Sequence, residues 1–263
     1  MPRVSVLMGI FNCAPYLQEA LDSLYAQTFQ DFEIILCEDG SSDNTYEIAK
    51  ANQNTHDNIV LLKNDRNYGL NETLNRCLKV AQGEYIARMD GDDISLPTRF
   101  QTEVEFLDSH PEYAIVTTPM KYFDEGGIFR VGMGGREPKL TDFPKFSPFC
   151  HAPCMVRKEA YDAVGGYSVA DNLLREEDYH LWIKMYQKGF RGYTLEEPLY
   201  MMRDDRNAAR RRNFKVRKNE AYVKHLACKM LGLPFYYHIY CLKPLILGIM
   251  PVWLYRLLYK LKK

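Results

Sequence analysis

The sequence carries no net charge, no regular cysteine framework and no uninterrupted apolar run long enough to span a bilayer. Its 34 basic residues balance 34 acidic ones, so the overall charge does not indicate a nucleic-acid partner. The seven cysteines follow no regular spacing and several lie within apolar runs, so we expect reduced thiols in the cytosol. The N-terminus lacks the apolar segment and small-residue cleavage site of a signal peptide. These absences favour a cytoplasmic protein.

What the sequence does contain is an alternation of apolar strands and helix-like segments over its first 89 residues. The expected strands are Val4–Ile10, Phe32–Cys37, Ile59–Leu62 and Tyr85–Met89, and the expected helices are Tyr16–Tyr25, Thr45–Ala51 and Leu70–Val80. This βαβ order is typical of an α/β protein with a parallel sheet.

Polar segments follow each of the four expected strands. They are Gly9–Asn12, Glu38–Asp43, Asn64–Gly69 and Asp90–Asp93. In open sheets of this kind ligands bind beyond the carboxyl ends of the strands. We therefore expect these four segments to converge on one crevice.

After Pro97 the pattern becomes mixed. We expect strands at Ala114–Thr118, Cys154–Val156 and Leu199–Met202, helices up to about Ser109 and at Lys158–Val164 and Glu176–Gln187, and an irregular, mobile stretch at Gly126–Gly135. The resulting domain prediction is one large domain of residues 1–205, in which the alternating part covers about 1–95 and the mixed part about 96–205. A basic and amphipathic helical tail, 206–263, follows it.

Three carboxylates lie within four residues in Asp90, Asp92 and Asp93. Their mutual repulsion is unfavourable unless a cation neutralises it. All-oxygen ligation suits Mg²⁺ or Mn²⁺, which often take one or two protein carboxylates together with phosphate oxygens and water. A nucleotide diphosphate fits that role. The alternative is an acidic turn in which Asp93 caps the next segment.

The combination of motifs resembles the family 2 glycosyltransferases over roughly residues 3 to 205. The motifs are V-S-V-L-M-G-I-F-N at the start, E-D-G-S-S-D-N-T at 38–45, D-G-D-D at 90–93 with Pro97 and Arg99, Gly165-Gly166-Tyr167, and Glu177-Asp178. The resemblance implies a GT-A fold, which is a Rossmann-like mixed sheet flanked by helices. It also implies a UDP-sugar donor, a divalent metal and inversion at the anomeric carbon. On this resemblance, residues 1–205 are a catalytic domain with a nucleotide-binding part of about 1–95 and an acceptor part of about 96–205.

The resemblance assigns a donor site at the strand ends. Asp39 falls where the family binds uracil, and a carboxylate there accepts the N3–H of uracil or thymine but does not pair with cytosine. Glu38 departs from the aspartate that the family often has, so its role is open. The further assignments are Gly9 and Phe11 in the nucleotide pocket, Asn67 near the base or ribose, Asp90 nearest the ribose or sugar, and Asp92 and Asp93 toward the diphosphate and the Mn²⁺ or Mg²⁺. A turn leading into a helix also explains Glu38–Asn44.

Inversion needs a base for the acceptor hydroxyl. Asp178 matches the family's E-D motif and is the candidate base, with Glu177 orienting the acceptor or Asp178. The alternative is favourable acidic charge in a first helical turn. His151 lies between two cysteines with poor spacing for zinc. In relatives a similar turn lies near the donor sugar, so His151 is a candidate pocket residue, with simple packing as the default.

The segment from Arg203 to Lys218 has eight basic and two acidic residues. Arg203 and Arg206 are candidate phosphate contacts through guanidinium hydrogen bonds, and the other cations suit anionic lipid. From Leu242 to Leu261 the tail mixes aliphatic, aromatic and basic residues without an acid. It favours helices lying on the cytoplasmic leaflet. The alternative is packing against the catalytic domain or a partner subunit.

The leading hypothesis is the transfer of one sugar from a UDP-sugar to a carbohydrate acceptor, a lipid-linked glycan for surface polysaccharide. The Q-x-x-R-W element of processive synthases is missing. The alternatives are a sugar-nucleotide pyrophosphorylase-like enzyme, whose glycine-rich basic loop is missing after the first strand, and a catalytically silent membrane-docked interaction protein. Nucleic-acid binding is the weakest hypothesis, and the sequence leaves an oligomer open.

Overall fold

The computed structural model describes residues 1–204 and 213–249, and all statements below refer to these residues. A seven-stranded mixed sheet has the order β10-β6-β9-β4-β1-β2-β3. Its strands are β1 (Val4–Ile10), β2 (Phe32–Glu38), β3 (Ile59–Lys63), β4 (Tyr85–Arg88), β6 (Ile115–Thr117), β9 (Met155–Arg157) and β10 (Gly192–Thr194). The β1 to β4 strands run parallel, whereas β9 is antiparallel to both of its neighbours.

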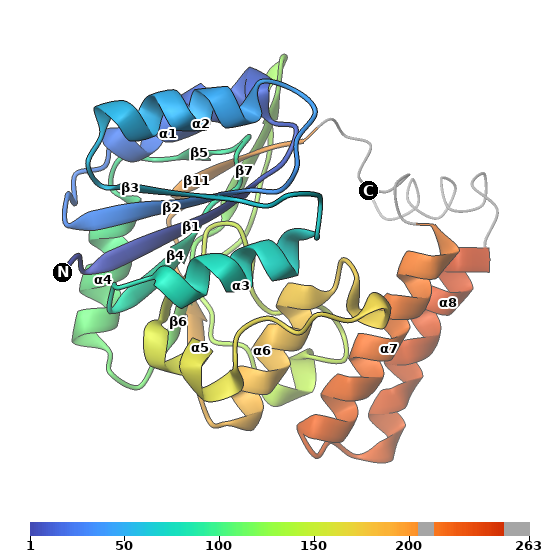
Figure 1. Cartoon of the computed structure of the whole chain (residues 1–263). Coiled ribbons are helices and arrows are strands. Elements are labelled where there is room, and N and C mark those ends of the chain that lie inside the picture. Colours follow the sequence, from blue (N-terminus) through green and yellow to red (C-terminus); the bar gives the residue numbers. More distant parts are fainter. Residues whose placement is uncertain (205–212, 250–263) are drawn as a thin grey trace.

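Two layers of helices cover the two faces of this sheet (Figure 1). Alternate side chains of β1 enter opposite cores, since Val6 and Met8 belong to one and Leu7 to the other. The first core is covered by α1 (Ala14–Tyr25), α2 (Thr45–Thr55) and α4 (Arg99–Ser109). The second is covered by α3 (Leu70–Val80), α5 (Lys158–Val164) and α6 (Glu177–Gln187). The expected elements are confirmed to within a few residues.

A second sheet of four strands has the order β5-β11-β7-β8. It consists of β5 (Ile94–Ser95), β7 (Met120–Asp124), β8 (Gly127–Val131) and β11 (Tyr200–Arg203). The β7–β8 hairpin corrects the expectation of an irregular stretch at Gly126–Gly135, which is wrong for Gly127–Val131. All five residues of β8 are exposed, so the sequence shows no burial pattern there.

The C-terminal helices pack on the second core rather than standing apart from it. α7 (Phe214–Met230) contacts α6 and the short helix η2 (Asp171–Leu173), and its Val223 and Ala227 are buried in that core. A helical turn, η4 (Phe235–Cys241), and α8 (Leu242–Ile249) lie along α7 (Figure 1). The third short helix is η1 (Leu140–Asp142). The domain boundary at residue 205 stays a prediction.

Within the described ranges, no helix combines the length and the apolarity needed to cross a bilayer. The part of the predicted tail from 250 to 263 lies outside those ranges. All seven cysteines lie within them and are free thiols.

Candidate active site

The strand register brings the ends of β1, β2 and β4 to one edge of the sheet. Of the four polar segments expected to share a crevice, Asp90–Asp93 lines the cleft described below, whereas Gly9–Asn12, Glu38–Asp43 and Asn64–Gly69 do not line it. Gly9 of β1 lies opposite Cys37 of β2, and Leu7 lies opposite Arg88 of β4. The residues that follow these strands therefore leave the sheet side by side. Gly91 packs closely on the end of β1 and on the residue before α1, because a Cβ there would lie 3.2 Å from Ile10 Cγ2 and 2.8 Å from Cys13 Sγ.

Asp39 is held in place by three hydrogen bonds from the loop after β3. Its Oδ1 accepts from Asn64 Nδ2 at 2.5 Å and from the Tyr68 backbone N–H at 2.9 Å, and its Oδ2 accepts from the Gly69 N–H at 2.9 Å. A carboxylate offers about four lone-pair positions. One position on Oδ2 therefore stays open to a further donor, although the side chain is only 3% exposed.

The turn after Asp39 depends on Glu38 and Gly40. The buried Glu38 carboxylate accepts a short hydrogen bond from the Ser41 N–H. Gly40 has φ +72°, and a Cβ there would lie 2.7 Å from the Arg66 carbonyl carbon and the Asn67 nitrogen. Only glycine permits this close approach. It places the exposed Asn67 beside the turn.

Gly9 and Phe11 differ in their surroundings. A Cβ on Gly9 would meet Leu70 at 2.9 Å and Thr73 at 3.2 Å, so this glycine lets α3 approach β1. Phe11 is 46% exposed just beyond the strand end. An exposed aromatic ring at a ligand-binding edge is available for stacking. The pocket roles of both residues stay predictions.

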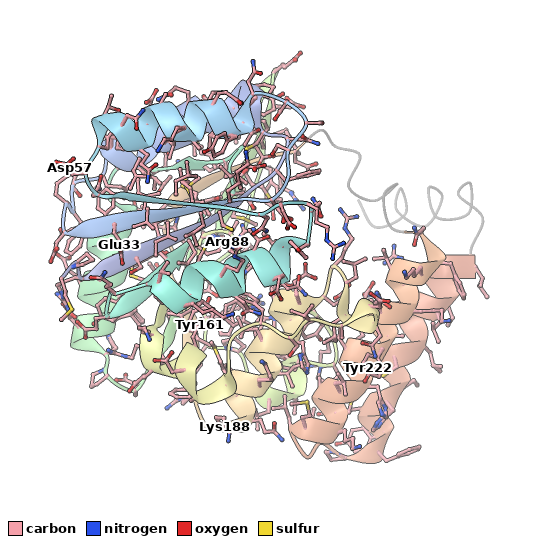
Figure 2. All side chains as sticks on the ribbon, viewed as in Figure 1. Glu33, Asp57, Arg88, Tyr161, Lys188 and Tyr222 are labelled. Carbon is pink, nitrogen blue, oxygen red and sulfur yellow. The ribbon has the colours of Figure 1, made fainter. Side chains whose placement is uncertain are left out.

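The three aspartates after β4 have different partners. Asp90 forms an ion pair with the buried Arg88, which lies in the interior of the molecule (Figure 2), and its backbone N–H donates to the Tyr200 hydroxyl at 3.2 Å. Burial, followed by the charge of Asp90, raises the pKa of Asp92. Burial and the charges of Asp90 and Asp92 raise the pKa of Asp93 well above its usual range.

Asp93 has one engaged and one unengaged oxygen. Oδ1 accepts from the Arg203 backbone N–H at 2.8 Å, whereas the buried Oδ2 has no hydrogen-bond partner among the described residues. An unpaired carboxylate oxygen in a cluster of three acids is costly unless a cation approaches it or a proton neutralises it. The raised pKa of Asp93 favours the protonated form, so this oxygen becomes a metal ligand only when that proton leaves.

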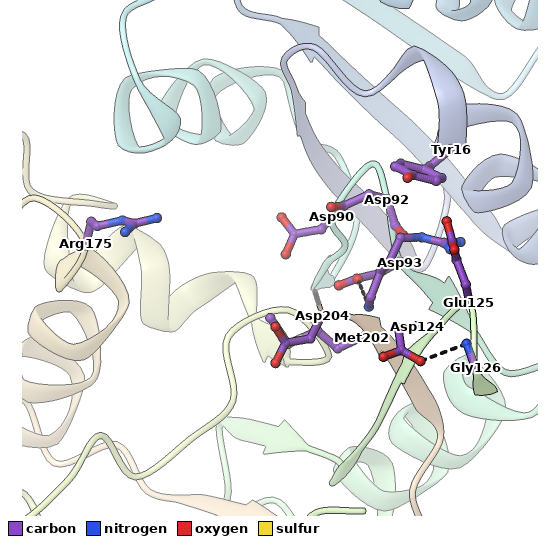
Figure 3. Close-up of a pocket in the computed structure, with 11 residues that line it drawn as sticks. Tyr16, Asp90, Asp92, Asp93, Asp124, Glu125, Gly126, Arg175, Met202 and Asp204 are labelled. Carbon is purple, nitrogen blue, oxygen red and sulfur yellow. Dashed lines mark hydrogen bonds between the residues drawn. The ribbon is translucent and has the colours of Figure 1, made fainter. Parts of the chain in front are cut away.

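A cleft of about 940 Å³ lies over the aspartates (Figure 3). Six carboxyl groups of the described residues line it, those of Asp90, Asp92, Asp93, Asp124, Glu125 and Asp204. Asp124 and Glu125 come from the β7–β8 hairpin, and the sequence reasoning missed them because no motif marks them. Arg175 and Arg203 also line the cleft.

The residues present fit a metal that arrives together with a diphosphate. No group of three His, Cys, Asp or Glu side chains in the described part is arranged to hold an ion by itself. Arg88 engages Asp90 and the Arg203 N–H engages one Asp93 oxygen, which leaves Asp92 and Asp93 Oδ2. Mg²⁺ and Mn²⁺ accept such a small oxygen set when phosphate oxygens and water complete it.

The guanidinium of Arg203 already has several partners within the protein, unlike that of an arginine kept free to bind phosphate. Its Nε donates to the Asp92 carbonyl at 3.0 Å and its Nη2 pairs with Glu19 at 2.5 Å. The guanidinium also lies 4.2 Å from the Tyr16 ring centroid and 4.5 Å from that of Phe123. Arg203 therefore holds the acidic loop, and its phosphate contact stays a prediction. Arg206 lies outside the described residues.

The predicted base lies at the start of α6, whose first residue is Glu177. Asp178 is half-buried, and its charge raises the pKa of both Glu177 and Cys150, so it lies close to each. Burial is the larger cause of the raised Glu177 pKa, and Glu177 Oε2 has no hydrogen-bond partner in the described ranges. Neither acid lines the cleft itself. The lining residue from this segment is Arg175.

His151 does not line the cleft and belongs to a row of hydrogen-bonded side chains. Its Nε2 lies 2.8 Å from the Tyr167 hydroxyl, which lies 3.0 Å from that of Tyr161. Burial, followed by the charge of Arg88, lowers the pKa of His151 well below its usual range. The ring is therefore neutral at pH 7, and this position favours the packing interpretation over a pocket role.

The sequence matches the model of glycosyl transferase family 2 over residues 5–165. The chain belongs to glycosyl transferase family 2. It is 42% identical over 251 residues to the putative glycosyltransferase EpsE of Bacillus subtilis (strain 168). This alignment covers 95% of this chain and 90% of EpsE. It is 25% identical over 244 residues to the Escherichia coli UDP-Glc:alpha-D-GlcNAc-diphosphoundecaprenol beta-1,3-glucosyltransferase WfaP, with 92% of each chain covered. The protein is therefore an enzyme of the glycosyltransferase class.

Two solved structures share the fold. TarS 1-349 of S. aureus in complex with UDP-GlcNAc superposes with a TM-score of 0.70 at 20% identity, covering 95% of this chain and 72% of that one. The mannosyltransferase PcManGT of Pyrobaculum calidifontis in complex with GDP-Man and Mn2+ superposes with a TM-score of 0.67 at 19% identity, covering 98% and 79%. The predicted GT-A fold is confirmed.

Proposed function

We propose that the protein is an inverting glycosyltransferase that moves one sugar from a UDP-sugar to a lipid-linked glycan in surface polysaccharide synthesis. The observation that carries this proposal is the convergence of the Asp39 turn and the Asp90–Asp93 loop on one edge of the sheet. WfaP, whose name specifies a UDP-glucose donor and a diphosphoundecaprenol-linked acceptor, supports both substrates.

The donor assignment follows from the polar atoms that stay open. The remaining lone pair of Asp39 Oδ2 accepts the N3–H of uracil. Asp92 and Asp93 hold Mn²⁺ or Mg²⁺ together with the diphosphate, and Asp90 lies toward the ribose or the sugar. The ion would offset negative charge on the departing UDP. Within the described part of the chain six carboxyl groups line this cleft, so a bare dianionic diphosphate would be repelled.

The acceptor assignment rests on α6. Asp178 takes the proton of the acceptor hydroxyl as that oxygen attacks the anomeric carbon opposite UDP. Glu177 orients the acceptor or Asp178, and its buried unpaired Oε2 accepts a hydrogen bond when the acceptor supplies a donor. Inversion follows because attack and departure occur on opposite faces.

A membrane surface is the proposed location of the acceptor. The exposed apolar side chains of η4 and α8 are Phe235, Tyr236, Ile239, Leu242, Ile246 and Ile249. From Ala221 to Lys263 the sequence has seven Lys or Arg residues and no acid. Apolar and aromatic side chains beside lysines suit the interface of an anionic leaflet.

The test is UDP release from a panel of UDP-sugars, with and without Mn²⁺ and with and without a GlcNAc-diphosphate lipid. We expect slow metal-dependent hydrolysis of one donor and faster release when the acceptor is present. Asp92→Asn should lose both reactions, whereas Asp178→Asn should lose the acceptor-dependent one. Full turnover in both variants would contradict the proposal.

A further inference from the structure

The cleft contains two arginines that differ in how their guanidinium groups are used. Arg203 is engaged by the Asp92 carbonyl, Glu19 and two aromatic rings. The exposed Arg175 has no hydrogen bond, ion pair or ring contact for its guanidinium within the described part of the chain. Among the described residues that line the cleft, Arg175 is thus the cation available to a ligand.

Arg175 also has an unfavourable backbone conformation. Its φ is +69°, and the only other non-glycine residue with positive φ in the described ranges is Asn12. Asparagine tolerates this region, whereas a long side chain without local hydrogen bonding does so rarely. Such strain persists only where the surroundings impose it, and it concentrates at functional sites.

The neighbours on both sides of Arg175 impose this conformation. Asn219 of α7 is 6% exposed, and its Nδ2 donates to the Asp171 and Leu174 carbonyls at 3.1 Å each. On the other side, the Glu176 N–H donates to the Leu173 carbonyl at 2.8 Å, and α6 then begins. The arginine is therefore presented by α7 and α6 together.

The direction of Arg175 indicates the ligand. In Figure 3 its side chain points across the cleft toward Asp90, from the wall opposite the three aspartates. The donor diphosphate belongs to the aspartate wall, where a metal would bind. Arg175 is three residues before Asp178, on the wall where the acceptor enters. An arginine binds a diphosphate through paired N–H groups.

We propose that Arg175 binds the diphosphate that joins the acceptor glycan to its lipid, and that Asn219 positions it. This assignment rests on the proposed function, and it adds a recognition residue that the family motifs do not include. It predicts that the enzyme distinguishes a glycosyl diphosphate from the same sugar without phosphate. It also predicts that a change in α7 alters acceptor recognition through the loop of residues 171–175.

The test compares two acceptors, a GlcNAc diphosphate with a short alkyl chain and the matched alkyl GlcNAc glycoside. Arg175→Asn removes the charge but keeps a residue that tolerates positive φ. We expect its KM for the diphosphate acceptor to rise about tenfold or more, while its KM for the neutral glycoside and its rate of UDP-sugar hydrolysis stay unchanged. Arg175→Lys should retain part of the affinity.

The matched control is Lys188→Asn, which removes an exposed cation from the other end of α6 (Figure 2) and should leave both KM values unchanged. Asn219→Ala should raise the ratio of the diphosphate KM to the neutral KM, with a smaller change than Arg175→Asn. A general loss of folding would change both KM values or kcat instead of this ratio.

Three results would overturn the assignment. The first is an equal loss of affinity for both acceptors in Arg175→Asn. The second is an altered KM for the UDP-sugar with an unaltered KM for the acceptor, which would assign Arg175 to the donor diphosphate. The third is that all KM values stay unchanged. The proposed function itself is tested by the wild-type enzyme alone, because it fails if no UDP-sugar is hydrolysed or transferred. The two failures are therefore distinguishable.

Discussion

The turn around Asp39, within residues 38–73, and the first turns of α6 differ in how far their buried polar groups are paired. Within residues 38–73, which are all described, every buried side-chain nitrogen and oxygen has a hydrogen-bond partner. In α6, four buried atoms lack one among the described residues, namely Glu177 Oε2, Tyr179 Oη, His180 Nδ1 and Trp182 Nε1. The first region is organised before any ligand arrives, whereas the second keeps hydrogen-bonding capacity unused.

The difference corresponds to the two substrates of the proposed reaction. A nucleotide has a fixed shape, so a preformed turn around Asp39 binds it without reorganisation. A glycan offers many hydroxyl groups, and the unpaired Glu177 Oε2 gains from a hydroxyl donor because an unsatisfied buried group is costly. Variants in the two regions should therefore change different quantities.

The largest effect is expected from Asp178→Asn. Removing a general base lowers kcat by about 10²- to 10⁴-fold, and UDP affinity should not change because the nucleotide end is untouched. Transfer kinetics and UDP titration measure the two quantities. The exposed Asp57→Asn is the charge-matched control and should alter neither. An unchanged kcat in Asp178→Asn would remove this residue from the mechanism.

Asp39→Asn should have the next largest effect, and on binding rather than on kcat. The Asp39 carboxylate accepts hydrogen bonds from the Tyr68 and Gly69 N–H groups. In the variant, the side-chain amide nitrogen is a donor, so it would face one of these N–H groups without forming a hydrogen bond. A lost hydrogen bond to a charged group weakens UDP binding by about 1.5–3 kcal/mol, or about 10- to 150-fold. Calorimetry checks this, with Asp31→Asn at the other end of β2 as control. Unaltered UDP affinity would refute the uracil assignment.

Gly40→Ala and Gly165→Ala separate backbone conformation from close packing. Both glycines have φ near +70°, but a Cβ meets backbone atoms at 2.7 Å from Gly40 and nothing within 4 Å at Gly165. Gly165→Ala should cost about 1–2 kcal/mol of unfolding free energy. Gly40→Ala should cost more and also weaken UDP binding, because it displaces Asn67. Equal losses of stability in the two variants would contradict the close approach of these loops.

The smallest effect is expected from Glu177→Gln, which should stabilise the protein. Burial and Asp178 raise the pKa of Glu177, so the folded state binds a proton more readily than the unfolded state. Stability is then lost as pH rises above the usual range of a glutamate. The melting temperature of Glu177→Gln should exceed that of wild type by more at pH 8 than at pH 5. Glu47→Gln, in the exposed first turn of α2, should show no such difference.

The sequence predicts the nucleotide end well for a physical reason. The parallel strands are buried, so their apolar runs define them, and the bounds of β1 and α3 are confirmed residue for residue. The rule that ligands bind beyond the carboxyl ends of parallel strands then brings Asp39 and Asp90 together without coordinates. At this end of the sheet, the apolar pattern that defines the strands also locates the predicted donor site.

The opposite wall is less predictable. Every residue of the β8 strand is exposed, so it has no periodicity to reveal it or its neighbours Asp124 and Glu125. Arg175 belongs to no motif, and its only signals are a positive φ and a guanidinium without a partner among the described residues, which coordinates alone provide. The partners of Arg203 likewise come from α1 and β7, which are distant in sequence.

The most direct test of the donor site is a calorimetric titration of UDP into wild type and Asp92→Asn, each with Mn²⁺ and with a chelator. We expect Mn²⁺ to tighten UDP binding to wild type about tenfold or more and to have little effect on Asp92→Asn. Equal UDP affinity in all four conditions would contradict a metal-bound diphosphate at the aspartates.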